Sequence, residues 1–189
     1  MEFEFDYFPV IETDRLIMRE INLEDLGALY KIFSSETVMK YYGMFPINEL
    51  KQAENLILSF RDGFDEEKSI RWGITLKESQ VFIGTCGFHN MQKRNYRAEI
   101  GYELSADHWN RGYITEAIGA MLEFGFGMMG LNRIEALVYP ENTASHKALE
   151  GLGFKEEGLL REYAYFRERF QDLVMHSLLR NEYVGLLID

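Results

Sequence analysis

A strand-like run, a short polar loop and a long apolar helix follow one another within residues 97–129, and this order constrains the chain more than any other feature. The run RAEIGYEL at 97–104 precedes the loop, and the apolar segment extends from Thr115 to about Met129. The first four N–H groups of a helix lack partners within it, and the helix dipole adds about half a positive charge there. Gly112 lets the backbone approach a ligand without a Cβ, and Arg111 supplies a cation. The segment therefore predicts a site for a phosphate or pyrophosphate.

The composition is typical of one soluble globular domain spanning residues 1–189, with residues 1–10 as a short N-terminal extension. The single cysteine, Cys86, excludes an internal disulfide and suits a reducing, cytoplasmic setting. The acidic start of the chain lacks the basic residues of a signal peptide. No apolar run reaches the ~18–20 residues that a membrane helix needs. We therefore expect a cytoplasmic protein with no membrane partner.

The net charge of -11 argues against a nucleic-acid partner, because a phosphate backbone attracts basic surfaces. The same charge favours a basic or amine-bearing partner by simple attraction. An acidic surface can equally serve solubility alone, so the charge leaves both interpretations open.

Hydrophobic periodicity and turn residues predict the element order β-α-α-β-β-β-α-β-α-β-β. A three-stranded meander followed by β-α-β units implies an α/β fold with one mixed sheet of about seven strands, flanked by about four helices. The predicted strands are 15–20, 71–76, 81–88, 97–104, 133–139, 159–166 and 173–179, and the predicted helices are 22–33, 46–61, 115–129 and 143–149. Such sheets bind ligands at the carboxyl ends of strands, where the loop at 110–115 is expected.

Several motifs that could indicate other chemistry are better explained by structure. Residues 125–130 match G-x-G-x-x-G, but they end a helix instead of opening one, so helix packing and a helix stop explain the glycines better. The four histidines show no zinc-binding spacing, so no metal is expected. Cys86 has the features of a small core residue, and neither a G-x-S-x-G nor a P-loop pattern occurs. A covalent intermediate on serine or cysteine is therefore not expected.

Four segments together resemble the GNAT superfamily of N-acetyltransferases, most closely the Rim-type branch that acetylates the N-termini of ribosomal proteins. The loop WNRGYITEA at 109–117 is similar to that family's coenzyme A pyrophosphate loop, although Trp109 and Ile114 differ from the usual pattern. The other matches are TDRLIMR at 13–19, AEIGY at 98–102, and PENTAS at 140–145 followed by LGF at 152–154. The resemblance covers nearly the whole chain, and the four matches occur in the family's order.

The resemblance implies an acetyl-CoA-dependent N-acetyltransferase in which an amine attacks the thioester directly. It implies that the pyrophosphate is bound by Asn110, Arg111, Gly112, Tyr113, Ile114 and Thr115. It further implies that the strand edge from Tyr102 to Leu104, together with Asn142, binds the pantetheine arm. By the same resemblance, Ser145 lies beside the thioester sulfur and Glu99 is the general base.

Each of these residues also has a plain structural interpretation. Asn142 can serve as an N-cap, and Ser145 can face solvent in the first helical turn. Glu99 can be an exposed strand residue paired with Arg94 or Arg97. However, Ala98 and Ile100 place the apolar face of this strand opposite Glu99, which favours a role for the carboxylate.

The acceptor can be argued from amine chemistry. An α-amine has a pKa near ~8 and a lysine one near ~10.4, so deprotonating lysine at pH 7 costs roughly 3.3 kcal/mol more. A protein N-terminus is thus the easier acceptor, while small amines such as antibiotics or polyamines stay open. The predicted helix at 48–61 and the segment 34–45 are expected to wall the acceptor cleft, with Tyr41, Tyr42, Met44 and Phe45 making it aromatic.

Two other classes of protein remain as alternatives. One is a non-catalytic acyl-CoA-binding module, and the other is an acidic protein that only binds partners. Relatives of the Rim-type branch are often dimers or trimers, so a homo-oligomer is expected, with Tyr163, Tyr165 and Phe166 as exposed aromatic residues.

Overall fold

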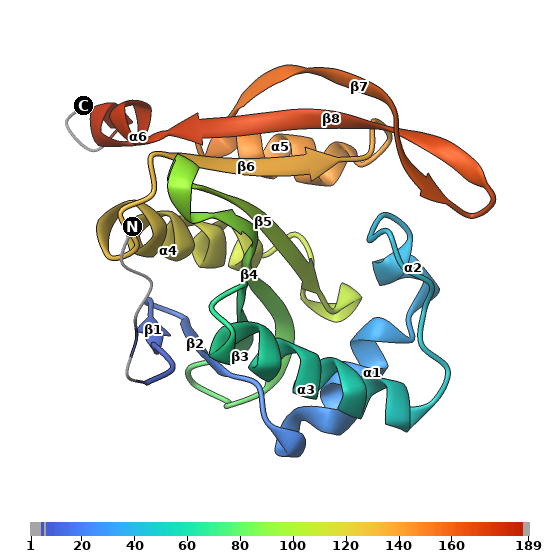
Figure 1. Cartoon of the computed structure of the whole chain (residues 1–189). Coiled ribbons are helices and arrows are strands. Elements are labelled where there is room, and N and C mark those ends of the chain that lie inside the picture. The colour runs from blue at the N-terminus through green and yellow to red at the C-terminus, as the bar shows by residue number, and fades with distance from the viewer. Residues whose placement is uncertain (1–4, 6, 187–189) are drawn as a thin grey trace.

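A computed structural model describes residue 5 and residues 7–186, with side chains up to residue 183. These residues form one eight-stranded sheet with helices on both faces (Figure 1). The elements are β1 (Ile11–Glu12), β2 (Leu16–Glu20), α1 (Leu26–Phe33), α2 (Glu36–Met39), α3 (Leu50–Asp65), β3 (Ile70–Leu76), β4 (Phe82–Gln92), β5 (Arg97–Leu104), α4 (Tyr113–Gly127), β6 (Arg133–Val138), α5 (Thr143–Gly151), β7 (Lys155–Phe166), β8 (Arg169–Leu179) and α6 (Arg180–Leu186). Residues 1–4 and 6 of the predicted N-terminal extension lie outside the described residues, but Pro9 accepts a hydrogen bond from the Trp72 indole, 2.8 Å long.

The strand order is β1-β2-β3-β4-β5-β6-β8-β7, and β5 with β6 is the parallel pair of the described sheet. The other neighbouring strands are antiparallel, in keeping with the meander and hairpin that the sequence predicts. The parallel ladder contains only three residue pairs, from Arg97–Arg133 to Glu99–Glu135. The remaining halves of β5 and β6 are therefore not paired with one another.

Each face of the sheet buries its own set of apolar side chains. On one face, Ala98 and Ile100 of β5 pack with Ile118 and Met121 of α4 in the main core. Trp72 is fully buried there, with its ring centroid 5.3 Å from that of Phe124. A second core on the other face is formed by α1, α3 and Phe82. The two cores fix α4 and the α1–α3 pair on opposite sides of β5.

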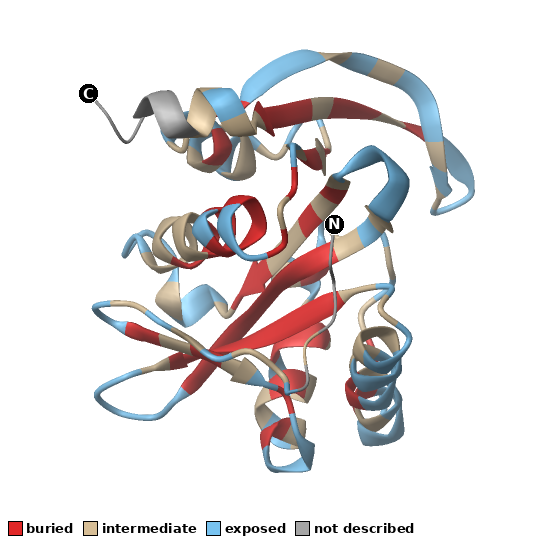
Figure 2. Ribbon diagram, turned by 60° about the vertical axis from the view of Figure 1, so that its left-hand side comes forward, coloured by how far each residue is buried: buried red, intermediate tan, exposed pale blue. Residues whose placement is uncertain are grey.

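The hairpin of β7 and β8 extends along the end of the sheet (Figure 2). β8 is largely buried between β6 and β7, whereas β7 is mostly exposed. The predicted turn at 168–171 is wrong by two residues, because the chain turns at Arg167 and Glu168, both with positive φ. Arg and Glu are unusual at such positions, so no residue typical of a hairpin turn marked the two central positions.

The predicted mixed α/β sheet is confirmed, and the differences concern short elements. The two-residue β1, the four-residue α2 and the terminal α6 were not predicted, so the sheet has eight strands instead of seven. The glycine-rich segment at 125–130 does end a helix: a Cβ on Gly125 would lie 2.8 Å from Phe88, and Gly130 has a φ of +67°. In the described part of the chain, no helix has both the length and the apolar character needed to cross a bilayer.

Candidate active site

The central feature of the candidate site is a gap between β5 and β6, where the two strands separate. After the Glu99–Glu135 pair the parallel ladder ends, so the strand edges beyond it do not satisfy each other's backbone groups. α4 and α5 lie on one face of this gap, and α1 and α3 cover the neighbouring strands on the other face. Two ligands can therefore approach the gap from opposite faces of the sheet.

The loop before α4 presents free backbone donors. The N–H groups of Gly112, Tyr113, Ile114 and Thr115 have no acceptor within the described residues, and the first helical bond runs from the Glu116 N–H to the Gly112 carbonyl. Gly112 has a φ of +76° and makes no side-chain cap. Four free N–H groups at a helix start are an arrangement that suits an anion, and the pyrophosphate site expected from the sequence stays a prediction. Asn110, with a φ of +59°, and Arg111 lie exposed on the approach to this start.

Arg15, at the start of β2, is tied to the same loop. Its Nε lies 2.6 Å from Oε2 of Glu116, and its Nη1 donates to the Arg111 carbonyl over 2.9 Å. The Thr13 hydroxyl also donates to Glu116, over 2.6 Å. Nearly half of the Arg15 side chain remains exposed, and its guanidinium lies 4.7 Å from the centre of the Tyr113 ring. Arg15 thus adds a second cation beside the free N–H groups.

Trp109 connects the loop to the end of β5. Its indole N–H donates to the Leu104 carbonyl over 2.8 Å. The Leu104 side chain is buried in the core, and its carbonyl already accepts this bond from Trp109. The unusual tryptophan therefore fixes the loop to the strand instead of disturbing it.

Glu99 lies at the point where the two strands separate. Its side chain is 12% exposed, and the Asn90 amide donates to its Oε1 over 3.1 Å. Burial raises the pKa of Glu99, the hydrogen bond from Asn90 opposes this rise, and the nearby Glu135 adds to it. Arg97 is bonded to Glu135, so the alternative interpretation of Glu99 as the ion-pair partner of Arg97 is not what the structure shows. Glu99 is thus a largely buried carboxylate whose pKa is moved toward neutrality.

His89 is the other titratable neighbour of Glu99, with Nε2 at 3.6 Å from Oε2. Burial and the nearby Arg71 lower the pKa of His89. The imidazole is therefore neutral at pH 7, and it does not hold Glu99 in its ionised form through an ion pair.

On the α5 side, three residues meet at the start of the helix. Asn142 is the N-cap of α5: its side-chain oxygen accepts from the Ser145 N–H over 3.3 Å, and its amide donates to the Ser145 hydroxyl over 3.0 Å. The Tyr102 hydroxyl is buried and has no hydrogen-bond partner of normal geometry among the described residues. Burial raises the pKa of Tyr102, and Ser145 is close enough to oppose that rise. Tyr102 is therefore a protonated donor without an acceptor.

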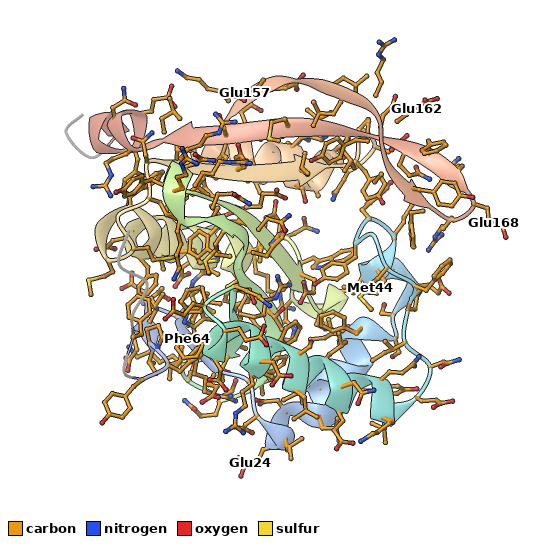
Figure 3. All side chains as sticks on the ribbon, in the orientation of Figure 1. Glu24, Met44, Phe64, Glu157, Glu162 and Glu168 are labelled. Carbon is orange, nitrogen blue, oxygen red and sulfur yellow. The ribbon has the colours of Figure 1, made fainter. Side chains whose placement is uncertain are left out.

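The segment after α2 reaches both β6 and the hairpin. The rings of Tyr41 and Tyr139 are 6.0 Å apart, and those of Phe45 and Phe166 are 4.9 Å apart. In Figure 3 the labelled Met44 lies on this segment, on the side of the molecule toward which the hairpin tip with Glu168 extends. These four aromatic residues form one wall beside β6 and the hairpin, and the predicted acceptor cleft at this segment stays a prediction.

A buried charged network contacts Tyr42, which follows Tyr41 in the same segment. Arg71 and Glu103 form a buried ion pair, and Arg71 also donates to Thr85 over 2.7 Å and to the Tyr42 hydroxyl over 3.1 Å. Its Nη1 donates to the Gly101 carbonyl over 3.0 Å. The network fixes Tyr42 against β5, and no sequence signal indicated it because its members are far apart along the chain.

Comparison with known proteins identifies the family. Residues 15–155 match the model of the acetyltransferase (GNAT) domain. The chain belongs to the GNAT acetyltransferase family. It is 39% identical over 173 residues to the uncharacterized N-acetyltransferase YoaA of Bacillus subtilis (strain 168), covering 92% of this chain and 98% of YoaA. It is 43% identical to the uncharacterized N-acetyltransferase p20 of Bacillus licheniformis, with 92% and 97% covered.

Solved GNAT structures have the same fold. A GNAT-family acetyltransferase from Bacillus anthracis superimposes with a TM-score of 0.83 at 26% identity, covering 92% of this chain and all of that one. A spermidine N-acetyltransferase from Vibrio cholerae, solved with CoA and spermine, superimposes with a TM-score of 0.80 at 22% identity, with 91% and 99% covered. The protein is thus a GNAT-type N-acetyltransferase by sequence, and the more distant structure shows the fold alone.

The name of one further relative indicates which molecule it is thought to acetylate. YdaF of Bacillus subtilis (strain 168), provisionally named a ribosomal N-acetyltransferase, is 31% identical over 132 residues, covering 70% of this chain and 71% of YdaF. This similarity agrees with the Rim-type branch that the sequence motifs resemble.

Proposed function

We propose that this GNAT protein transfers an acetyl group from acetyl-CoA to a primary amine, with the protein N-terminal α-amine as the preferred acceptor. The observation that carries the proposal is the gap between β5 and β6, with free N–H donors on one face and a buried carboxylate at its edge. A gap open to both faces lets donor and acceptor bind at the same time. Holding both in one cleft removes the entropy cost of a bimolecular encounter.

The donor binds on the α4 and α5 face. The pyrophosphate accepts hydrogen bonds from the N–H groups of Gly112 to Thr115, while Arg15 and Arg111 neutralise its charge. The pantetheine arm follows the free edge of β5 from Tyr102 to Leu104, and Asn142 contacts it from α5. This route ends beside Ser145 and Tyr102.

The reaction needs one proton acceptor and one hydrogen-bond donor. The amine nitrogen forms a bond to the thioester carbonyl carbon, the C–S bond breaks, and the amine proton passes to Glu99, directly or through water. The departing thiolate accepts a hydrogen bond from Ser145 or from the unpartnered Tyr102 hydroxyl. A thiol pKa near ~8.5 makes this thiolate a modest base, so a hydrogen bond is sufficient for its departure.

Three facts support the α-amine as acceptor. It costs less to deprotonate than lysine, by roughly 3.3 kcal/mol at pH 7. YdaF, the relative provisionally named a ribosomal acetyltransferase, is 31% identical to this chain over 132 residues. The wall made by Tyr41, Phe45, Tyr139 and Phe166 can contact an extended peptide.

Thiol release from acetyl-CoA, measured with matched acceptors, tests the proposal. Peptides with a free α-amine should react faster than Nα-blocked peptides that carry one lysine. The reverse order would contradict the α-amine, and fast turnover of spermidine alone would assign the enzyme to polyamines. Acetyl-CoA binding without turnover on any amine would identify a non-catalytic coenzyme-binding module instead.

A further inference from the structure

A cluster of two imidazoles and one carboxylate lies outside the residues assigned to acetyl transfer. His146 comes from α5, Glu156 from β7 and His176 from β8, and one ligand atom of each lies within 4.8 Å of the others. Glu156 and His176 are register partners in the hairpin, so their side chains share a face of the sheet. The three positions are far apart in the sequence, so no zinc-like spacing could reveal them.

The proton arrangement of this cluster prepares two nitrogens to bind a metal. Nε2 of His146 lies 3.2 Å from the Tyr139 carbonyl, which can only accept, so this nitrogen carries the proton. Nδ1 of His146 then directs its lone pair at Nε2 of His176, 2.8 Å away. The two rings share a single proton at the position that a metal ion can occupy in its place. Nδ1 of His176 is buried without a partner within the described residues, so it is free to take up the proton that leaves Nε2 when a metal ion binds there.

The ligand set matches one class of ion. Two imidazoles and a carboxylate are the protein ligands of several zinc sites that keep one position for water. Imidazole suits Zn(II), Co(II), Ni(II) and Cu(II), whereas Mg(II) and Ca(II) prefer oxygen ligands. The bond from His146 to the Tyr139 carbonyl is the outer contact that commonly orients a metal-bound histidine.

Only small movements are needed to admit the ion. With metal–nitrogen bonds of about 2.0–2.1 Å, two tetrahedral ligands lie about 3.3 Å apart. The two imidazoles must therefore separate by about half an ångström. Glu156 is exposed, so its carboxylate can rotate toward the ion, and solvent can supply the fourth ligand.

We propose that His146, Glu156 and His176 form a binding site for a divalent transition-metal ion of the zinc class. The ion joins the first half of α5 to both strands of the β7–β8 hairpin. Asn142 and Ser145 lie at the start of α5. The ion therefore stabilises the position of α5 and of these two residues, and it takes no part in acetyl transfer.

Metal titration of the full chain, without an affinity tag and after treatment with a chelator, tests the proposal. Calorimetry should find one Zn(II) per chain, and Co(II) should give the visible absorption bands of a nitrogen-ligated ion. At a free Zn(II) concentration of 100 times Kd, the Tm should rise by roughly 5–10 °C. Absence of saturable Zn(II) binding would overturn the proposal.

Three variants separate this site from adventitious binding to an acidic surface. Glu156→Gln and His146→Phe should each weaken Zn(II) at least about tenfold, since even the loss of an outer contact costs about that much. Glu150→Gln, an exposed change on the same helix, should leave the affinity unchanged. Equal affinity in all variants, or an equal loss in Glu150→Gln and Glu156→Gln, would overturn the site. If His146→Phe does not fold, the exposed Glu156 decides the outcome.

Discussion

Arg15 binds Glu116 through Nε and Oε2, which lie 2.6 Å apart, and this pair joins the start of β2 to the first turn of α4. The Arg15 main-chain N–H donates to the same carboxylate over 2.9 Å. Glu116 therefore holds Arg15 where its exposed guanidinium can face a phosphate bound to the loop. The same ion pair therefore stabilises the conformation of the loop and places a positive charge beside it.

Arg15→Gln should raise the KM for acetyl-CoA about tenfold and leave kcat nearly unchanged, because a charged hydrogen bond contributes about 1.5–3 kcal/mol. Acetyl-pantetheine, which lacks the pyrophosphate, provides the control, and its KM should be the same with both enzymes. An equal increase for both donors would show that Arg15 only maintains the fold.

Gly112→Ala should weaken acetyl-CoA binding, because a φ of +76° strains any L-residue and the new Cβ lies 3.4 Å from Nη2 of Arg15. Gly127→Ala is the matched control, since a Cβ there contacts nothing within 4 Å. This control should leave coenzyme affinity unchanged and stabilise the fold by up to about 1 kcal/mol. Calorimetric titration with CoA and thermal unfolding measure both effects, and equal CoA affinities for the two variants would refute the role of the loop.

The hydrophobic pattern predicted the fold because each long element repeats its signal several times. α4 and the strands β3, β4 and β5 contribute many buried side chains, so one polar residue at a buried position does not obscure the hydrophobic periodicity of the element. α2 has only four residues and β1 only two, too few to show any period. β7 is mostly exposed on both faces and turns through Arg167 and Glu168, so it lacked alternation and turn residues.

The candidate site could be predicted in part. The anion loop depends on local chain geometry, so its free N–H groups follow from a strand, a glycine and a helix start. The contact between Arg15 and Glu116 spans 101 residues, and only the tertiary structure brings them together. Asn90 contacts Glu99 because β4 and β5 pair beside it, a relation that one sequence cannot reveal.

The lowered pKa of Glu157 in β7 predicts how the stability of the fold changes at acid pH. Hydrogen bonds from Arg133 and Ser177 lower the pKa of Glu157 to about 2. A carboxylate with a lowered pKa stabilises the fold above its unfolded pKa of about 4.3, and this stabilisation is lost as the pH falls toward 2. Because the side chain is 43% exposed, Glu157→Gln should cost only about 1 kcal/mol at pH 7.

Urea unfolding of both proteins at several pH values measures this effect. The difference between wild type and Glu157→Gln should vanish near pH 2, the value about which Glu157 titrates in the fold. Glu78→Gln, in the exposed turn after β3, should show no difference at any pH. A constant loss for Glu157→Gln across the range would assign the effect to packing instead of charge.

Asn90→Gly tests the environment of the proposed base. Asn90 has a φ of +48°, which glycine adopts without strain, so the change removes the amide but keeps the backbone. The amide lowers the pKa of Glu99, so its loss should raise that pKa further. The acid limb of the kcat/KM profile should then move to higher pH. An unmoved limb would show that another group controls it.

The pH profile of Glu99→Gln tests the central claim most directly. A general base contributes about 10²–10⁴ to the rate, so kcat at pH 7 should fall by that factor while the Kd for acetyl-CoA stays nearly unchanged. The loss should shrink as the pH rises, because more of the acceptor amine is then already deprotonated. Near-normal turnover of Glu99→Gln at pH 7 would contradict the account and place the base elsewhere.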